Sequence, residues 1–113
     1  MADFALKEGD LVPSITATLE DSDGTPIDIT AADVTFVMRA IRGDAPIIEA
    51  AATNLQAGAE TTGQVRYDWA PGDTDTPGGY DAEWRVEFAE GFGTIPSNRY
   101  IAVEILPKLG GGS

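Results

Sequence analysis

The sequence contains neither cysteine nor histidine. Without cysteine, the chain cannot form a disulfide, a thiolate nucleophile or a cysteine-based zinc site. Without histidine, it lacks the commonest general base and the commonest transition-metal ligand, so no Ser-His-Asp or Cys-His catalytic system can be built from it. Only carboxylates, a few lysines and arginines, and tyrosines remain for catalysis. We therefore predict that the protein is not an enzyme and uses no cofactor.

Basic residues are also scarce. Seven lysines and arginines stand against nineteen aspartates and glutamates, which gives a formal net charge of -12. This excess repels a phosphate backbone, and no basic patch with interleaved aromatic residues offsets it. No apolar run approaches the roughly 18 residues of a membrane span. The sequence therefore predicts no nucleic-acid and no membrane partner, whereas the negative charge favours solubility and attracts basic partners.

The length of 113 residues is typical of one domain, and a domain of this size can fold without a metal or a disulfide. We expect a single domain over residues 1–108. Within it, residues 1–10 form either the first strand or an arm that reaches another subunit. Residues 109–113 have the Gly/Ser composition of a flexible tail.

What the sequence does contain is alternation of apolar and polar residues. The clearest strand is predicted at residues 80–88, and others at 4–6, 15–19, 65–69 and 101–105. Residues 34–41 are apolar on both faces at their centre, as in a central strand that is partly shielded on its outer side. Residues 26–29 are expected to be a short extended piece.

One segment is ambiguous. Residues 47–53 are rich in alanine, which favours a helix, but they are few and lie among strands. We predict a strand there and a loop over residues 55–63.

Turn signals separate these segments. The clusters at residues 21–24 and 70–79 combine Asp, Pro and Gly, and Glu90-Gly91-Phe92-Gly93 is predicted to be a hairpin turn. Seven or eight short strands with frequent turns and no convincing helix predict an all-β fold. The expected architecture is an antiparallel two-sheet β-sandwich of the immunoglobulin-like type.

Four aromatic residues are expected to be structural. Trp69 and Trp84 are in phase with the apolar face of their strands, so core packing is favoured over ligand stacking. Phe36 lies at the centre of the most strand-like run. Tyr80 follows an acidic, glycine-rich turn and begins an alternating strand, which is the setting of a tyrosine corner, although an ordinary core position is the alternative.

Two acidic turns could supply oxygen ligands for calcium through Asp21, Asp23, Asp73 and Asp75. The twelve-residue calcium loop that ends in a bidentate Glu is absent, and aspartate is common in turns for its own hydrogen bonds. Turn formation is therefore favoured over a metal site.

Several of these motifs together resemble the N-terminal domain of phage baseplate upper proteins. The resemblance covers residues 11 to 106 and is carried by framework strands and turns, not by an active site. Its first half is PSITATL, DSDGTPIDIT and VTFVMR. Its second half is VRYDW, GDTDTPGGY and AEW, with Ile95-Pro96 before the last strand.

The resemblance implies a phage virion β-sandwich that works by protein–protein assembly, as a tail, baseplate, neck or capsid-decorating subunit. The implied partners are other virion proteins and further copies of the chain, and the implied location is the virion, after synthesis in the host cytoplasm. The alternative is a module that binds carbohydrate or a host surface through exposed aromatics such as Phe92 or Tyr100.

Overall fold

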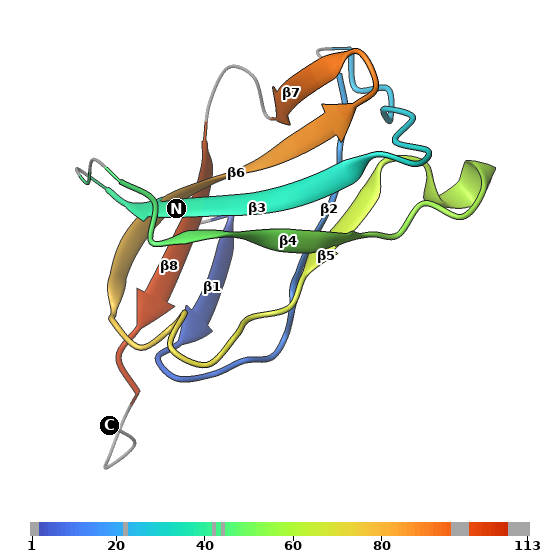
Figure 1. Ribbon diagram of the computed structural model, residues 1–113. Helices are drawn as coiled ribbons and strands as arrows, with labels where there is room; N and C mark the ends of the chain where they lie inside the picture. Colours follow the sequence, from blue (N-terminus) through green and yellow to red (C-terminus); the bar gives the residue numbers. More distant parts are fainter. Residues whose placement is uncertain (1–2, 22, 42, 44, 96–99, 109–113) are drawn as a thin grey trace.

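The computed structural model describes residues 3–21, 23–41, 43, 45–95 and 100–108. These residues form eight β-strands and no α-helix (Figure 1). The all-β prediction is therefore confirmed. The strands are β1 (Phe4–Lys7), β2 (Ile15–Thr18), β3 (Asp33–Ala40), β4 (Ile48–Asn54), β5 (Gln64–Tyr67), β6 (Gly78–Phe88), β7 (Gly91–Ile95) and β8 (Ile101–Leu106), with a short 3₁₀ turn, η1, at Ala59–Thr61.

The strands join in the order β1-β8-β6-β3-β4-β5-β2, and β7 pairs with β6 beside this path. The sheet curls into a nearly closed, barrel-like form, with β1 and β2 at the two ends of the order (Figure 1). The prediction of an antiparallel fold needs one correction, because β1 pairs with β8 in parallel. Strand alternation does not encode this direction, which depends on how the chain enters the sheet.

The long central pair β3 and β6 organises the core. Phe36 lies opposite Trp84 and Val34 opposite Val86 in the antiparallel register, and all four side chains are buried. Because side chains alternate between the two faces of a strand, one in-phase set of apolar residues is enough to fill the interior. Full burial of one such side chain contributes about 1.5–3 kcal/mol.

The predicted core aromatics form one cluster inside the barrel. The ring of Phe36 stacks on Tyr67 with a centroid separation of 4.8 Å and lies 5.0 Å from Trp84. Trp69 meets Phe36 edge-on at 5.7 Å. The indole N–H of Trp69 donates a hydrogen bond to the carbonyl of Pro13 at 3.1 Å, which ties the segment before β2 to this cluster.

The ambiguous alanine-rich segment is strand β4, in which Ile48, Ala50 and Ala52 pair with β3. Residues 55–63 form the expected loop, which contains η1. The extended piece at residues 26–29 makes only an isolated bridge, between Glu20 and Pro26.

The predicted hairpin is present, but the bounds predicted for its turn, residues 90–93, were wrong. The turn is residues 89–90, and Gly91–Ile95 is strand β7, paired with β6 from Phe88↔Gly91 onwards. Gly91 and Gly93 suggested a turn, but glycine also permits the strand start, where Gly91 has φ 143°.

Of the two alternatives for residues 1–10, Phe4–Lys7 lies in the sheet as strand β1. The predicted tail at residues 109–113 lies outside the described residues.

Candidate functional site

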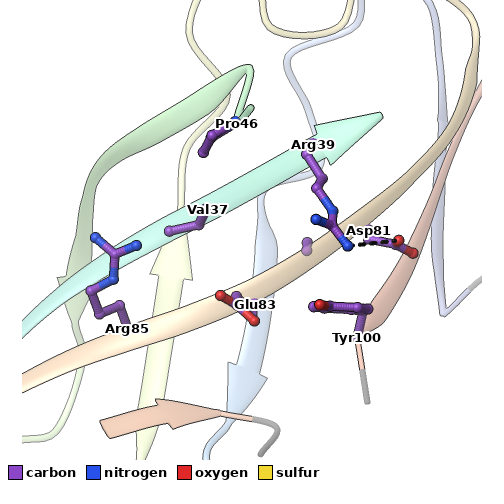
Figure 2. Close-up of a pocket in the computed structure, with 8 residues that line it drawn as sticks. Val37, Arg39, Pro46, Asp81, Glu83, Arg85 and Tyr100 are labelled. Carbon is purple, nitrogen blue, oxygen red and sulfur yellow. Dashed lines mark ion pairs between the residues drawn. The ribbon is translucent and has the colours of Figure 1, made fainter. Parts of the chain in front are cut away.

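A small pocket of about 160 Å³ lies on the outer face of β3 and β6 (Figure 2). Its walls combine four charged residues, one aromatic ring and three small or apolar residues, which come from β3, β6, the connection before β4 and the residue before β8. They are Val37, Arg39, Pro46, Asp81, Ala82, Glu83, Arg85 and Tyr100. We call this feature the outer pocket.

Val37 belongs to the outer face of β3, because its neighbours Phe36 and Met38 fill the core. It is nevertheless only 8% exposed. The outer side chains therefore cover it, as the two-sided apolar pattern of residues 34–41 predicts.

Charged pairs surround this apolar residue. The guanidinium of Arg39 lies 4.9 Å from the centroid of the Tyr100 ring and 4.0 Å from Oδ2 of Asp81. Arg85 donates a hydrogen bond from Nη1 to Oε2 of Glu49 at 2.7 Å, across β3. Both ion pairs are partly exposed, and such pairs contribute about 0.2–1 kcal/mol each. The outer pocket thus offers paired donors and acceptors beside an aromatic ring.

The four aspartates named as a calcium alternative do not come together. The turn that holds Asp21 and Asp23 lies at one end of the barrel, and the turn that holds Asp73 and Asp75 lies at the other (Figure 1). Within the described ranges, no group of three or more acidic residues is placed to hold a metal ion.

Two of these carboxylates have turn-forming roles instead. Oδ1 of Asp21 accepts hydrogen bonds from the N–H groups of Asp23 and Thr25, at 2.9 and 3.1 Å. Oδ2 of Asp73 accepts one from the hydroxyl of Tyr67 at 2.6 Å and one from the N–H of Ala70 at 2.8 Å. Burial, together with this bond and the nearby charge, raises the pKa of Tyr67 well above its usual range.

Tyr80 begins the inner face of β6 after the second acidic turn. Tyr80 is 4% exposed, and its hydroxyl donates a hydrogen bond to the carbonyl of Thr76 at 2.5 Å. Burial raises the pKa of the hydroxyl. This bond fixes the turn between β5 and β6 to the sheet.

A polar network that the sequence analysis did not identify fastens the segment before β3. Oε1 of Gln56 accepts from the N–H of Ile29 at 2.8 Å, and its Nε2 donates to Oδ1 of Asp28 at 2.8 Å. Asn54 donates to the carbonyls of Ile29 and Ala32. The hydroxyl and N–H of Thr30, and then Gln56, lower the pKa of Asp28 to about 2.

A second pocket, of about 210 Å³, lies between β1 and β2. It is lined by Asp3, by Phe4 of β1, by Ile15, Thr16 and Ala17 of β2, and by Trp84 and Ile101. We call it the seam pocket, because β1 and β2 end the strand order and do not pair with each other. Sequence alternation gave no signal for it, since it depends on which strands remain unpaired.

Comparison with known proteins found no matching family model, no matching curated protein and no matching solved structure. Among the described residues, no helix is long and apolar enough to cross a membrane. The interpretation of function therefore depends on the surfaces described above.

Proposed function

We propose that the protein is a structural subunit of a phage particle and acts by protein–protein assembly. The observation that carries the proposal is the number of open sheet edges. In the part of the chain that the structure describes, β1, β2 and β7 each have a sheet neighbour on one side only. A strand edge presents unpaired N–H and C=O groups that another chain can pair with.

The phage setting of this proposal comes from the sequence resemblance to baseplate upper proteins. The proposed partners are other virion proteins and further copies of the chain, and the proposed location is the virion. A subunit of this kind needs a rigid core and accessible edges but no chemistry.

We also propose the finer fold assignment, an immunoglobulin-like sandwich. Strand β4 pairs with β3 over Ile48–Ala52 and with β5 through Thr53 and Asn54, so the curled sheet divides naturally at this strand. One layer is then β1-β8-β6-β3-β4 and the other β4-β5-β2. The bond from Tyr80 back to Thr76 at the start of β6 has the form of the tyrosine corner of such sandwiches.

Mass spectrometry of purified phage particles tests the function. We expect the protein in mature virions at a fixed ratio to the major structural proteins, and labelled electron microscopy should place it at one repeated position. A protein that is abundant in infected cells but missing from purified particles would contradict the proposal. Light scattering over a range of concentrations tests self-association separately, and we expect the mass to rise above that of one chain.

The outer pocket favours a second candidate, carbohydrate or host-surface binding. Tyr100 is 47% exposed and stands beside hydrogen-bonding groups of Arg39 and Asp81, which is a common setting for a polar ligand. A glycan array with and without calcium tests it. Binding that Tyr100→Ala abolishes and Phe92→Ala preserves would support this candidate; Phe92, 68% exposed, lies on β7 outside the pocket. Failure to bind any glycan would refute it.

A further inference from the structure

The main chain of β6 alternates between the strands on its two sides. The N–H of Ile41 donates to the carbonyl of Gly79, which places the main-chain groups of the odd-numbered β6 residues on the side of β3. The even-numbered residues, among them Trp84 and Val86, therefore direct their groups towards β7. This alternation determines which groups of β7 are already used.

Two residues of β7 have main-chain groups that point away from β6. Gly93 and Ile95 pair with even-numbered residues of β6, so their N–H and C=O groups face β6. Because successive residues alternate, the N–H and C=O groups of Phe92 and Thr94 face the other way. Among the described residues, β6 is the only strand that pairs with β7 (Figure 1). The outer edge of β7 therefore offers two donors and two acceptors to another strand.

The side chains of this edge are uncharged, and one of them is a strongly exposed aromatic. Residues 91–95 read Gly-Phe-Gly-Thr-Ile, and Phe92, which pairs with Glu87 on the outer face, is 68% exposed. The other two open edges differ. Strand β1 contains Lys7 and follows Asp3, and β2 adjoins β1 across the seam pocket. Charged side chains on an edge strand discourage pairing with another sheet, so β7 is the edge best suited to it.

The sequence of β7 complements itself about a two-fold axis at Gly93. An antiparallel second copy in this register places Phe92 beside Thr94 of the second copy, and their outward N–H and C=O groups bond to each other. It also places Gly91 beside Ile95 of the second copy. A Cβ on Gly91 would have no atom within 4 Å, so the isoleucine has room there. In each pair a bulky side chain meets a smaller residue.

Local charge permits this pairing and selects its register. No charged side chain of residues 91–95 would meet its counterpart, whereas an axis at Phe92 would bring Glu90 of the turn into the ladder from both copies. The net charge of -12 on each chain opposes association at longer range. Because salt screens this repulsion and leaves the uncharged contact intact, association through β7 should strengthen as salt is added.

We propose that two copies of the chain pair through the outer edges of β7, antiparallel, about a two-fold axis at Gly93. The two sheets then form one continuous sheet. This proposal rests on the proposed assembly function and specifies one contact between like subunits. A five-residue edge buries less surface than the roughly 1,200 Å² at which standard-size interfaces begin, so the isolated dimer should have a Kd on the order of 0.1–1 mM. Repeated contacts within a particle would strengthen it.

Nuclear magnetic resonance of the ¹⁵N-labelled full chain, from micromolar to millimolar concentration, tests the proposal. We expect amide exchange at Phe92 and Thr94 to slow as the concentration rises. Exchange at Thr16 and Thr18, whose groups face away from β5 on the open edge of β2, should stay constant. In a mixture of labelled and unlabelled protein, an intermolecular nuclear Overhauser effect should connect the ring of Phe92 with the methyl group of Thr94. Sedimentation equilibrium should approach double the mass of one chain, and salt should raise the dimer fraction.

Two matched pairs of variants separate edge pairing from other effects. Thr94→Pro removes the outward N–H without touching a bond to β6, and Thr94→Val keeps that N–H. We expect Thr94→Pro to dimerise at least about tenfold more weakly, because each dimer loses two hydrogen bonds, and Thr94→Val to dimerise like the original chain. Phe92→Glu should abolish dimerisation. Ile47→Glu adds the same charge at a side chain that is 53% exposed and lies before β4, off this edge, so it should dimerise like the original chain.

The opposite results would overturn the proposal. They are a single-chain mass up to millimolar concentration, protection at Thr16 in place of Thr94, equal dimerisation of the two Thr94 variants, or a dimer that salt dissociates. The exchange measurement on the unaltered chain decides the question even if Thr94→Pro does not fold. If the chain stays monomeric but is present in virions, the edge proposal fails and the assembly function stands. A β7 dimer of a protein absent from virions would show the reverse.

Discussion

Removal of one hydroxyl group at the start of β6 should measurably weaken the fold. In Tyr80→Phe, the buried ring stays in place, but the hydrogen bond to the carbonyl of Thr76 is lost. A typical bond of this kind contributes about 0.5–1.5 kcal/mol, and an acceptor left buried without a partner adds to the loss. Thr76 is exposed, so water can reach its carbonyl. We therefore expect no added penalty and a loss of about 0.5–1.5 kcal/mol.

Urea unfolding followed by tryptophan fluorescence gives this free energy directly. The midpoint should fall while the denaturant dependence stays unchanged, since the same surface is exposed on unfolding. For a chain of this length, the expected loss lowers Tm by about 2–6 °C.

Tyr67→Phe provides the matched comparison. The hydroxyl of Tyr67 donates to a carboxylate oxygen of Asp73, and bonds to charged groups contribute about 1.5–3 kcal/mol. Tyr67→Phe should therefore destabilise the protein more than Tyr80→Phe does. A Tyr80→Phe protein within about 0.3 kcal/mol of the original, or the reverse order of the two variants, would refute this reasoning.

Three further predictions concern pH, backbone strain and calcium. The pKa of Tyr67 is raised in the folded state, so its contribution to the free energy of unfolding should be fully present below about pH 10. Above that pH, the free energy of unfolding should fall by up to about 1.4 kcal/mol per pH unit. Urea titrations at several pH values should show a smaller slope for Tyr67→Phe. Gly63→Ala should lower the free energy of unfolding by about 2–4 kcal/mol, because the new Cβ would lie 2.7 Å from the carbonyl oxygen of Leu19. Gly72 also has a positive φ but faces open space, so Gly72→Ala should lower it by only about 1 kcal/mol. Millimolar calcium should leave Tm unchanged in differential scanning calorimetry, because the acidic turns lie at opposite ends of the barrel; a dose-dependent rise would restore the calcium interpretation.

Where the strands lie, and which of their faces turns inward, followed from local sequence. Residues 80–88 alternate so regularly that Tyr80, Trp84 and Val86 could be assigned to the core before any neighbour was known, and all three are buried. The shielded outer position of Val37 was also implied by the two-sided apolar run of β3. Such predictions succeed because alternation has a fixed period of two that depends only on the backbone of one strand.

The candidate sites could be predicted only in part. Tyr100 was singled out as an exposed aromatic, but its contact with Arg39 requires β3 and the start of β8 to be neighbours of β6. The link between Gln56 and Asp28 likewise joins two loops that are distant in sequence.

The sequence by itself determined an all-β chain with an aromatic core, a strong negative charge and few groups suited to catalysis. Only the tertiary structure decided that β1 runs parallel to β8, that Gly91–Ile95 is a strand, and that β1 and β2 do not pair with each other. Several distant segments can form the same backbone hydrogen bonds with a given strand. The alternation of residues within that strand does not determine which of these segments pairs with it.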